Sequence, residues 1–147
     1  MKKWRATRDL LYRGDHAHGV NTPDPDASAS IVRHILQMEG PGMSSPYLST
    51  TEQQDTAEYF ATPGGKVYTL SVGDLPPGKL KHRPRLELLQ CLKGVGKGDA
   101  KWENSFEILS AKRLVELHSE HLIDSRECKG LSQDEIAEAV SQAFKAR

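Results

Sequence analysis

Hydrophobic residues recur at strand-like spacings in several parts of the chain. Residues 4–13 end in three large hydrophobic side chains just before Gly14, as expected of a strand that stops at a turn. The segment Tyr47–Leu48 is predicted to be a short strand. In residues 67–72, the side chains that would point to one face of a strand alternate with those of the other face, and both faces mix polar and hydrophobic residues, which predicts a second strand. Residues 106–117 also alternate, which predicts a hairpin-like pair of strands.

Two internal stretches follow the helical period instead. The first helix is expected to begin at Ser28 or Ser30 and to end near Gly40. The second runs from Glu52 to about Ala61, directly after the hydroxyl-rich sequence Tyr-Leu-Ser-Thr-Thr. This places a strand, a hydroxyl cluster and a helix in immediate succession.

The clearest helix pattern covers about residues 132–146. Ser132 stands three residues before Glu135, which is the spacing of a capping box. Hydrophobic residues then recur at every fourth position from Ile136 to Phe144. We expect this C-terminal helix to dock its apolar stripe on the body of the domain.

These elements indicate the class of fold. The 147 residues fit one domain, residues 1–147, with a sizeable core. Residues 86–92 fit either a short helix or a strand. The predicted strands and helices do not alternate regularly, which favours an α+β fold over a doubly wound sheet.

Composition excludes few functions. The chain has 20 basic and 20 acidic residues, so its net charge does not indicate a nucleic-acid or membrane partner. No hydrophobic run approaches the roughly 18 residues of a membrane-spanning helix, and residues 1–14 lack the apolar centre of a signal peptide. Cys91 and Cys128 are expected to be free thiols, with a single disulfide as the alternative.

Three local patterns have ordinary explanations. The glycine-rich loop at residues 94–98 matches neither a phosphate loop nor the dinucleotide pattern, so we interpret it as a mobile connector. His118 and His121 lack a supporting Cys or carboxylate cluster, so no metal is expected. The basic cluster within residues 79–85 is either a solvated face or a surface that binds phosphates.

Three further features, taken in order, carry a functional hypothesis. Singly, Arg13 suits an ion pair, Ser49–Thr51 a helix cap and Glu107 an exposed strand position. The succession Leu-Tyr-Arg-Gly, Tyr-Leu-Ser-Thr-Thr, Val-Tyr-Thr-Leu and Phe-Glu-Ile-Leu resembles the Arg-Ser-Glu branch of the mono-ADP-ribosyltransferases. That branch includes cholera-toxin-like bacterial toxins and arginine-directed vertebrate enzymes. The resemblance covers roughly residues 8–115.

The resemblance implies two small, roughly perpendicular antiparallel sheets with NAD in the cleft between them. It also implies transfer of ADP-ribose from NAD while positive charge develops on the ribose. Arg13 would hold NAD through its phosphate or ribose oxygens. Ser49 would position the catalytic glutamate, and Glu107 would bind the ribose 2′-hydroxyl and stabilise the cation. The other expected NAD-binding residues are Gly14, His16, Thr50, Thr51 and Phe60, with Tyr59 as an alternative to Phe60.

One position leaves the acceptor open. Arginine-directed members usually carry Glu or Gln two residues before the catalytic glutamate, where this chain has Ser105 on the acceptor side. The acceptor is therefore a protein side chain or a nucleic acid, and water as acceptor would make the chain an NAD glycohydrolase. An alternative of another class is a non-enzymatic binding module that uses the basic cluster and the C-terminal helix.

The resemblance also suggests a biological setting. It implies a bacterial toxin or effector that is secreted and acts in the cytoplasm of a host or competitor cell, with a module cut from a larger polypeptide as one alternative. The alternative location is the cytoplasm of the producing cell. The expected partners are NAD, a macromolecular target and a cognate immunity protein, and the expected state is a monomer without a membrane span.

Overall fold

The computed structural model describes residues 3–36, 44–94 and 96–147, which form a mixed α+β fold, as predicted. The strands are β1 (Leu11–Asp15), β2 (Tyr47–Thr51), β3 (Lys66–Leu70), β4 (Lys81–Arg83), β5 (Glu120–Asp124) and β6 (Phe144–Ala146). The helices are α1 (Ile31–Leu36), α2 (Gln54–Ala61), α3 (Arg85–Cys91), α4 (Ser105–His118) and α5 (Gln133–Ala143). Short 3-10 turns cover Val72–Asp74, Gly98–Ala100 and Arg126–Cys128.

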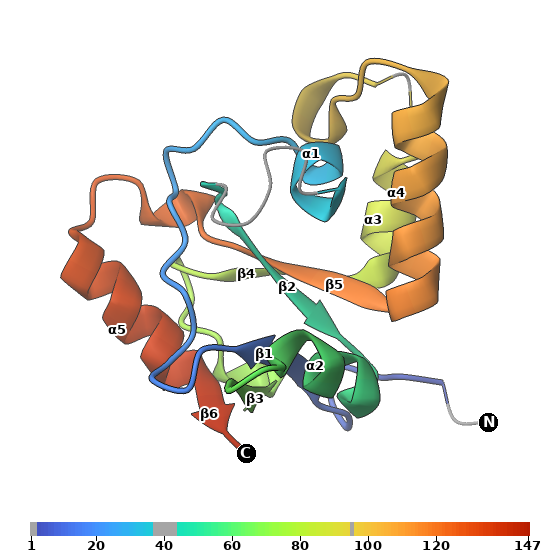
Figure 1. Ribbon diagram of the computed structural model, residues 1–147. Helices are drawn as coiled ribbons and strands as arrows, with labels where there is room; N and C mark the ends of the chain where they lie inside the picture. Colours follow the sequence, from blue (N-terminus) through green and yellow to red (C-terminus); the bar gives the residue numbers. More distant parts are fainter. Residues whose placement is uncertain (1–2, 37–43, 95) are drawn as a thin grey trace.

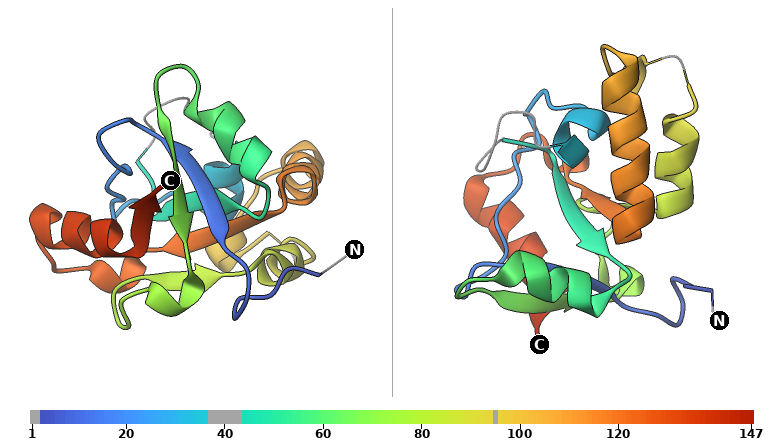
Figure 2. Two further views of the ribbon diagram at one scale, coloured as in Figure 1. Left: turned by 90° about the horizontal axis from the view of Figure 1, so that it is seen from below. Right: turned by 45° about the vertical axis from the view of Figure 1, so that its right-hand side comes forward.

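The strands form one antiparallel sheet in the order β4-β5-β2-β1-β3-β6. At its centre, β1 and β2 share a single residue pair, Tyr12 with Thr51, whereas the other neighbours share three to five pairs. Figure 1 shows that β2 approaches β1 only at its C-terminal end, and Figure 2 shows β1, β3 and β6 side by side. A division into two separate perpendicular sheets is not shown.

Two hydrophobic clusters lie on opposite faces of β2 and β5. Successive side chains of a strand point to opposite faces. Tyr47 and Leu122 therefore belong to a cluster with α1, α3 and α4, whereas Leu48 and Ile123 belong to a cluster with α5, β1 and β3. Figure 1 shows α1, α3 and α4 gathered at one end of the molecule and α5 at the other.

Helix α2 lies directly on β1 because two glycines leave room for its backbone. A Cβ atom on Gly14 would lie 2.2 Å from the carbonyl oxygen of Ala57 and 2.5 Å from the amide nitrogen of Ala61. A Cβ atom on Gly65 would lie 2.4 Å from the Ala61 carbonyl oxygen. Any side chain at either glycine would push α2, and Phe60 with it, away from the sheet.

The C-terminal helix was predicted correctly in its start and in its docking. The capping box between Ser132 and Glu135 is present, and Ile136 and Val140 are buried in the core. The helix ends at Ala143, however, so Phe144 lies in β6 and pairs with Leu70. The segment that follows the helix thus adds an edge strand to the sheet.

The predicted pair of strands at residues 106–117 is wrong, because this segment is helix α4. The Asn104 side chain caps the helix by accepting a hydrogen bond from the Glu107 amide (3.0 Å). Ala111 and Val115 then follow Glu107 at intervals of four on the buried face. The short alternation around Phe106 is a by-product of this longer helical period.

Three further predictions concern the start of the first helix, the cysteines and membrane-spanning segments. Ser30 accepts a hydrogen bond from the Arg33 amide at the start of α1, and the predicted end near Gly40 lies outside the described residues. Cys91 and Cys128 are free thiols. In the part of the chain that the structure describes, we find no helix of the length and hydrophobicity needed to cross a membrane.

Candidate functional site

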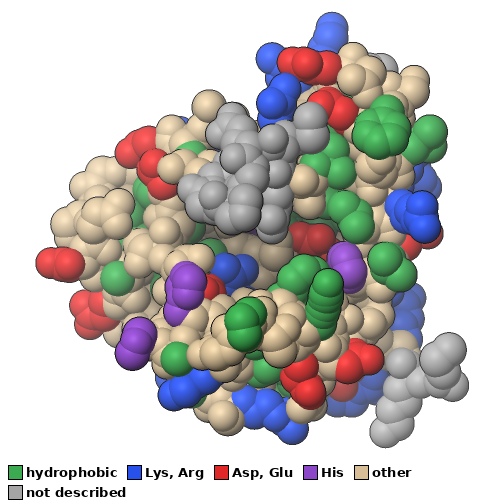
Figure 3. Space-filling view, in the orientation of Figure 1, with side chains coloured by type: hydrophobic (Ala, Val, Ile, Leu, Met, Phe, Trp, Pro, Cys, Tyr) green, Lys and Arg blue, Asp and Glu red, His purple; other side chains and the backbone are tan. Residues whose placement is uncertain are grey.

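A cavity of about 990 Å³ lies where β1, β2 and β5 meet α2 and the end of α4. Figure 3 shows this hollow in the middle of the face viewed, beside hydrophobic side chains of the helices. Seven of the residues predicted to bind NAD line it, namely Arg13, Gly14, His16, Ser49, Thr50, Thr51 and Phe60. The local motifs around Arg13 and the Ser-Thr-Thr triplet therefore meet in space, although 36 positions separate Arg13 from Ser49.

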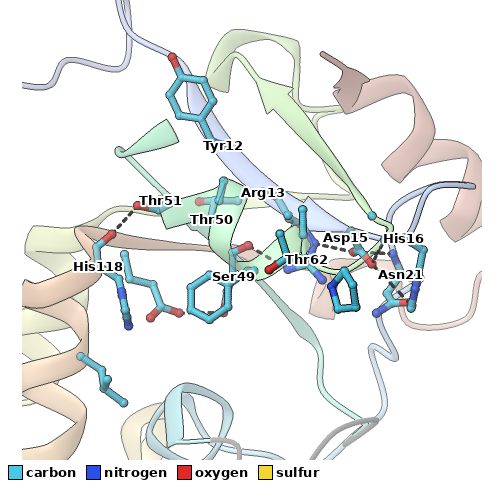
Figure 4. A pocket seen from close by; sticks show the side chains of 18 of the residues that line it. Tyr12, Arg13, Asp15, His16, Asn21, Ser49, Thr50, Thr51, Thr62 and His118 are labelled. Carbon is cyan, nitrogen blue, oxygen red and sulfur yellow. Dashed lines mark hydrogen bonds and ion pairs between the residues drawn. The ribbon is translucent and has the colours of Figure 1, made fainter. Parts of the chain in front are cut away.

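Arg13 is held in one orientation at the cavity wall. Its Nε donates to Asp15 Oδ2 (2.8 Å), and its Nη1 donates to the Ser49 carbonyl oxygen (2.9 Å). Asp15 is fixed in turn by the amides of His16 and Asn21. Figure 4 shows Arg13, Asp15 and Asn21 at one end of the cavity, with Ser49 between them and His118. The other guanidinium N–H groups form no hydrogen bond with a described residue and suit an anionic ligand.

Besides Asp15, which is paired with Arg13, the cavity wall contains a second acidic side chain, Glu120, at the start of β5. Ser49 pairs with Leu122 and Thr51 with Glu120, so Ser49 and Glu120 are diagonal neighbours on one face of the sheet. The Ser49 hydroxyl donates a hydrogen bond to Glu120 Oε2 (2.8 Å). Burial raises the pKa of Glu120 to about 7, against the opposing effects of the Ser49 hydrogen bond and the Arg13 charge.

His34 of α1 extends this contact into a chain of hydrogen bonds. Its Nε2 lies 2.8 Å from Ser49 Oγ, and its Nδ1 lies 2.6 Å from Ser45 Oγ. Burial, aided by the positive charge of Arg13, lowers the pKa of His34 to about 3, so the imidazole is neutral. The Ser49 hydroxyl gives its only proton to Glu120, so at Nε2 it accepts from the imidazole N–H. Nδ1 of the neutral ring is then the acceptor and receives the Ser45 hydroxyl proton.

The hydroxyl groups of the two threonines in the triplet hydrogen-bond to backbone groups and hold the local structure in place. The Thr50 hydroxyl donates to the His121 carbonyl oxygen (3.0 Å), and the Thr51 hydroxyl donates to the His118 carbonyl oxygen. Thr51 Oγ1 also accepts from the Gln53 amide (3.0 Å), just before α2 begins. The triplet thus fixes β2 against both the start of β5 and the start of α2.

The structure does not bring Glu107 to this site. Glu107 lies in the first turn of α4, where its carboxylate accepts a hydrogen bond from the Glu103 amide (2.8 Å). It is buried among helix residues and is absent from the cavity wall that the described residues form. Ser105 is the exposed first residue of α4 and is not among the residues that line the cavity. Both assignments depended on the incorrect strand.

Sequence reasoning missed Glu120 and His34. Glu120 lies in the sequence His-Ser-Glu-His-Leu-Ile, whose two hydrophobic residues are too few to predict a strand. A usable signal was Asn104 three residues before Glu107, a helix-start spacing that would have moved the strand beyond His118. For His34, the sequence indicates only that it lies among the apolar positions of a predicted helix, and nothing in the pattern points to a role in a site.

The position two residues before Glu120 is His118. It is the last residue of α4, lines the cavity and packs edge-on against the Phe60 ring, with centroids 5.3 Å apart. The Ser119 backbone is left-handed (φ 45°), which lets the chain turn sharply from α4 into β5. His118 therefore stands at the mouth of the cavity beside Glu120.

Three members of the basic cluster at residues 79–85 are engaged internally. Arg83 is 5% exposed and forms an ion pair with Asp124 (3.0 Å). Arg85 Nε lies 3.1 Å from Glu52, and His82 hydrogen-bonds His121 (2.8 Å). Only the two lysines at positions 79 and 81 are exposed among these basic side chains of the described chain. The cluster is therefore mainly structural.

The described residues contain no group of three or more His, Cys, Asp or Glu side chains arranged to hold a metal ion. Comparison with known proteins adds no assignment, because no family model, curated protein or solved structure matches the chain.

Proposed function

We propose that this chain is a mono-ADP-ribosyltransferase, with an ADP-ribosyltransferase-like fold, that moves ADP-ribose from NAD to a macromolecule. The proposal rests on one observation above all. Arg13, Ser49 and Glu120 line one cavity, and the Ser49 hydroxyl is hydrogen-bonded to the Glu120 carboxylate. The Arg-Ser-Glu set that the sequence suggested is thus retained, with Glu120 in place of Glu107.

The chemistry follows from these groups. The bond between ribose C1′ and the nicotinamide nitrogen breaks, and its electron pair leaves with neutral nicotinamide. The Glu120 carboxylate stabilises the positive charge that develops on the ribose. A nucleophilic group of the acceptor bonds to C1′ and loses its proton. Arg13 supplies the always charged, fixed group that holds an NAD phosphate.

Ser49 and His34 keep the carboxylate ready for this role. A carboxylate with a pKa of about 7 is only partly ionised at neutral pH. The hydroxyl of Ser49 donates to it, and His34 donates to Ser49, so the chain of donors favours the ionised form. His34 and Ser49 are therefore positioning residues for Glu120.

The decisive experiment compares two buried glutamates. Purified protein is incubated with NAD and cell-lysate macromolecules, and nicotinamide release and the mass added to acceptors are measured. We expect Glu120→Gln to lower the rate about a hundredfold or more, because the stabilising charge is lost. Glu107→Gln serves as the matched control and is expected to keep nearly full activity, since Glu107 lies in α4 away from the cavity.

Other outcomes would change the assignment. Loss of activity in Glu107→Gln with retention in Glu120→Gln would overturn the role of Glu120. Nicotinamide release without labelled macromolecule would favour an NAD glycohydrolase. A folded wild-type protein that neither binds NAD nor releases nicotinamide would disprove the proposed function.

A further inference from the structure

Exposed hydrophobic side chains of α2 and α4 lie beside the cavity. The described residues include seven exposed large hydrophobic side chains, and the two outside this surface are Leu10 and Leu86. Figure 3 shows hydrophobic side chains gathered over these helices at the edge of the hollow. Patches of this kind on a small protein often mark an interaction site. The five that form this α2–α4 surface are Tyr59, Phe60, Phe106, Leu109 and Leu117.

Helical spacing explains the part of the surface that α4 contributes. Phe106, Leu109, Arg113 and Leu117 follow one another at i, i+3, i+7 and i+11, which places them on one face of the helix. Ala111 and the other buried residues occupy the opposite face. From Phe106 to Leu117 the helix rises about 16 Å, the length of three helical turns. A partner segment of similar length fits along it.

The α2–α4 surface leads into the candidate site. A groove of about 480 Å³ separates α2 from the end of α4, and its walls include Tyr59, Phe60, Leu117 and His118. Phe60 and His118 also line the main cavity. A molecule bound along α4 would therefore continue through the groove to the mouth beside Glu120.

The charges beside this surface favour a protein over a nucleic acid. Arg113 is exposed in the middle of the α4 face, and it forms no ion pair with any residue that the structure describes. A cation that has no ion-pair partner among the described residues, set beside hydrophobic side chains, complements an apolar segment that carries a carboxylate. Nucleic-acid binding needs several cations along a backbone, and Arg83 and Arg85 are already paired with Asp124 and Glu52.

We propose that the acceptor is a protein that docks on the α2–α4 surface through apolar side chains, with a carboxylate opposite Arg113. The docked protein presents the residue to be modified through the groove at His118. This inference rests on the proposed transferase function and specifies the acceptor class, which that function leaves open.

The test separates docking from NAD binding. The full chain is given NAD that carries biotin on its adenine, together with soluble lysate protein at limiting concentration. We compare the double variant Phe106→Ser/Leu109→Ser and the charge reversal Arg113→Glu with Leu86→Ser, an exposed leucine on α3. Leu86 is 61% exposed, close to the 65% of Leu109, so it is a matched control.

We expect both surface variants to lower protein labelling about tenfold or more at limiting acceptor, with recovery as lysate protein is raised. Leu86→Ser is expected to label like the wild type. NAD affinity, measured by calorimetry, is expected to be unchanged in every variant, because none of these residues lines the cavity. Arg113→Glu leaves all apolar packing in place and so tests docking even if the double variant folds poorly.

Three results would overturn the inference. If Arg113→Glu labelled protein as well as the wild type does, the α2–α4 surface would not take part in acceptor binding. Biotin found in nuclease-sensitive material rather than in protein would assign a nucleic-acid acceptor. A wild-type protein that binds no NAD and labels nothing would disprove the transferase function and this inference with it. Normal NAD binding together with wild-type labelling by the surface variants would disprove the docking surface alone.

Discussion

Opposing effects on single side chains set the protonation of the site. Glu120 loses solvation by burial, which raises its pKa to about 7, while the Ser49 hydroxyl and the Arg13 charge act in the other direction. His34 is forced to be neutral by burial and by Arg13, so it acts as a hydrogen-bond donor without adding charge. One arginine thus favours both the ionised glutamate and the neutral histidine.

This balance predicts a pH effect of Ser49→Ala. Removing the hydroxyl donor raises the pKa of Glu120 further, by about one unit if a hydrogen bond to a charged group is lost. If ionised Glu120 is required, kcat/KM for NAD rises with pH, and its acidic limb, near pH 7 in the wild type, moves upward in the variant. Rates measured from acid to mildly alkaline pH check this.

Thr62→Ala is the control for Ser49→Ala. Thr62 also lines the cavity, but its hydroxyl donates to the Tyr59 carbonyl oxygen rather than to Glu120. We expect its acidic limb to stay at the wild-type pH. An unshifted limb in Ser49→Ala, with only a uniformly lower rate, would contradict the role of Ser49 in setting the ionisation of Glu120.

At the scale of elements, local signals were reliable and long-range ones were not. The helix after the Ser-Thr-Thr triplet and the capping box at Ser132 are each specified within a few residues, and the structure has both. The strand expected to stop before Gly14 instead continues through Gly14 to Asp15, and the triplet lies within β2 rather than in a turn. Strands β4 and β5 depend on partners far along the chain, because β5 pairs with β2 about 70 residues earlier. The five-residue run of β5 carries no period of its own from which it could be predicted.

Element packing at Gly14 yields a stability prediction. In Gly14→Ala the new methyl group would meet the backbone of α2 at 2.2 Å, and backbone atoms cannot rotate away. We expect the free energy of unfolding to fall by about 1–3 kcal/mol or more, as overpacking does elsewhere. Urea unfolding measures this change, and NAD affinity should fall too because α2 carries Phe60 into the cavity wall.

Gly73→Ala is the matched control for packing. A Cβ atom there meets nothing within 4 Å, so we expect a change within about 0.5 kcal/mol. Equal losses in the two variants would show that the general flexibility of glycine, rather than the contact between α2 and β1, determines the effect. Unchanged stability in Gly14→Ala would mean that α2 can move off β1 freely.

At the scale of the whole molecule, the site glutamate and three histidines give opposite pH dependences of folding. The pKa values of His34 (about 3), His82 (about 4) and His121 lie below the ordinary 6.5, mainly through burial. Below about pH 6.5 the unfolded chain binds these protons and the folded chain does not, so they reduce stability as pH falls. Glu120 binds a proton in the folded state between about pH 7 and 4.5, so it adds stability as pH falls.

Glu120→Gln should separate these two contributions. At about pH 8 the variant has no buried charge at position 120, so we expect it to be more stable than the wild type, by up to about 3 kcal/mol for a shift from 4.5 to about 7. The advantage should shrink as pH falls and vanish below about pH 4.5, where the wild-type carboxyl is protonated in both states. Unfolding in urea at several pH values between 5 and 8 measures the difference. If the variant and the wild type differed in free energy of unfolding by a constant amount across this range, the pKa of Glu120 would not be raised. If the difference instead closes as pH falls, the stability lost at neutral pH comes from the same buried carboxylate that the proposed reaction requires.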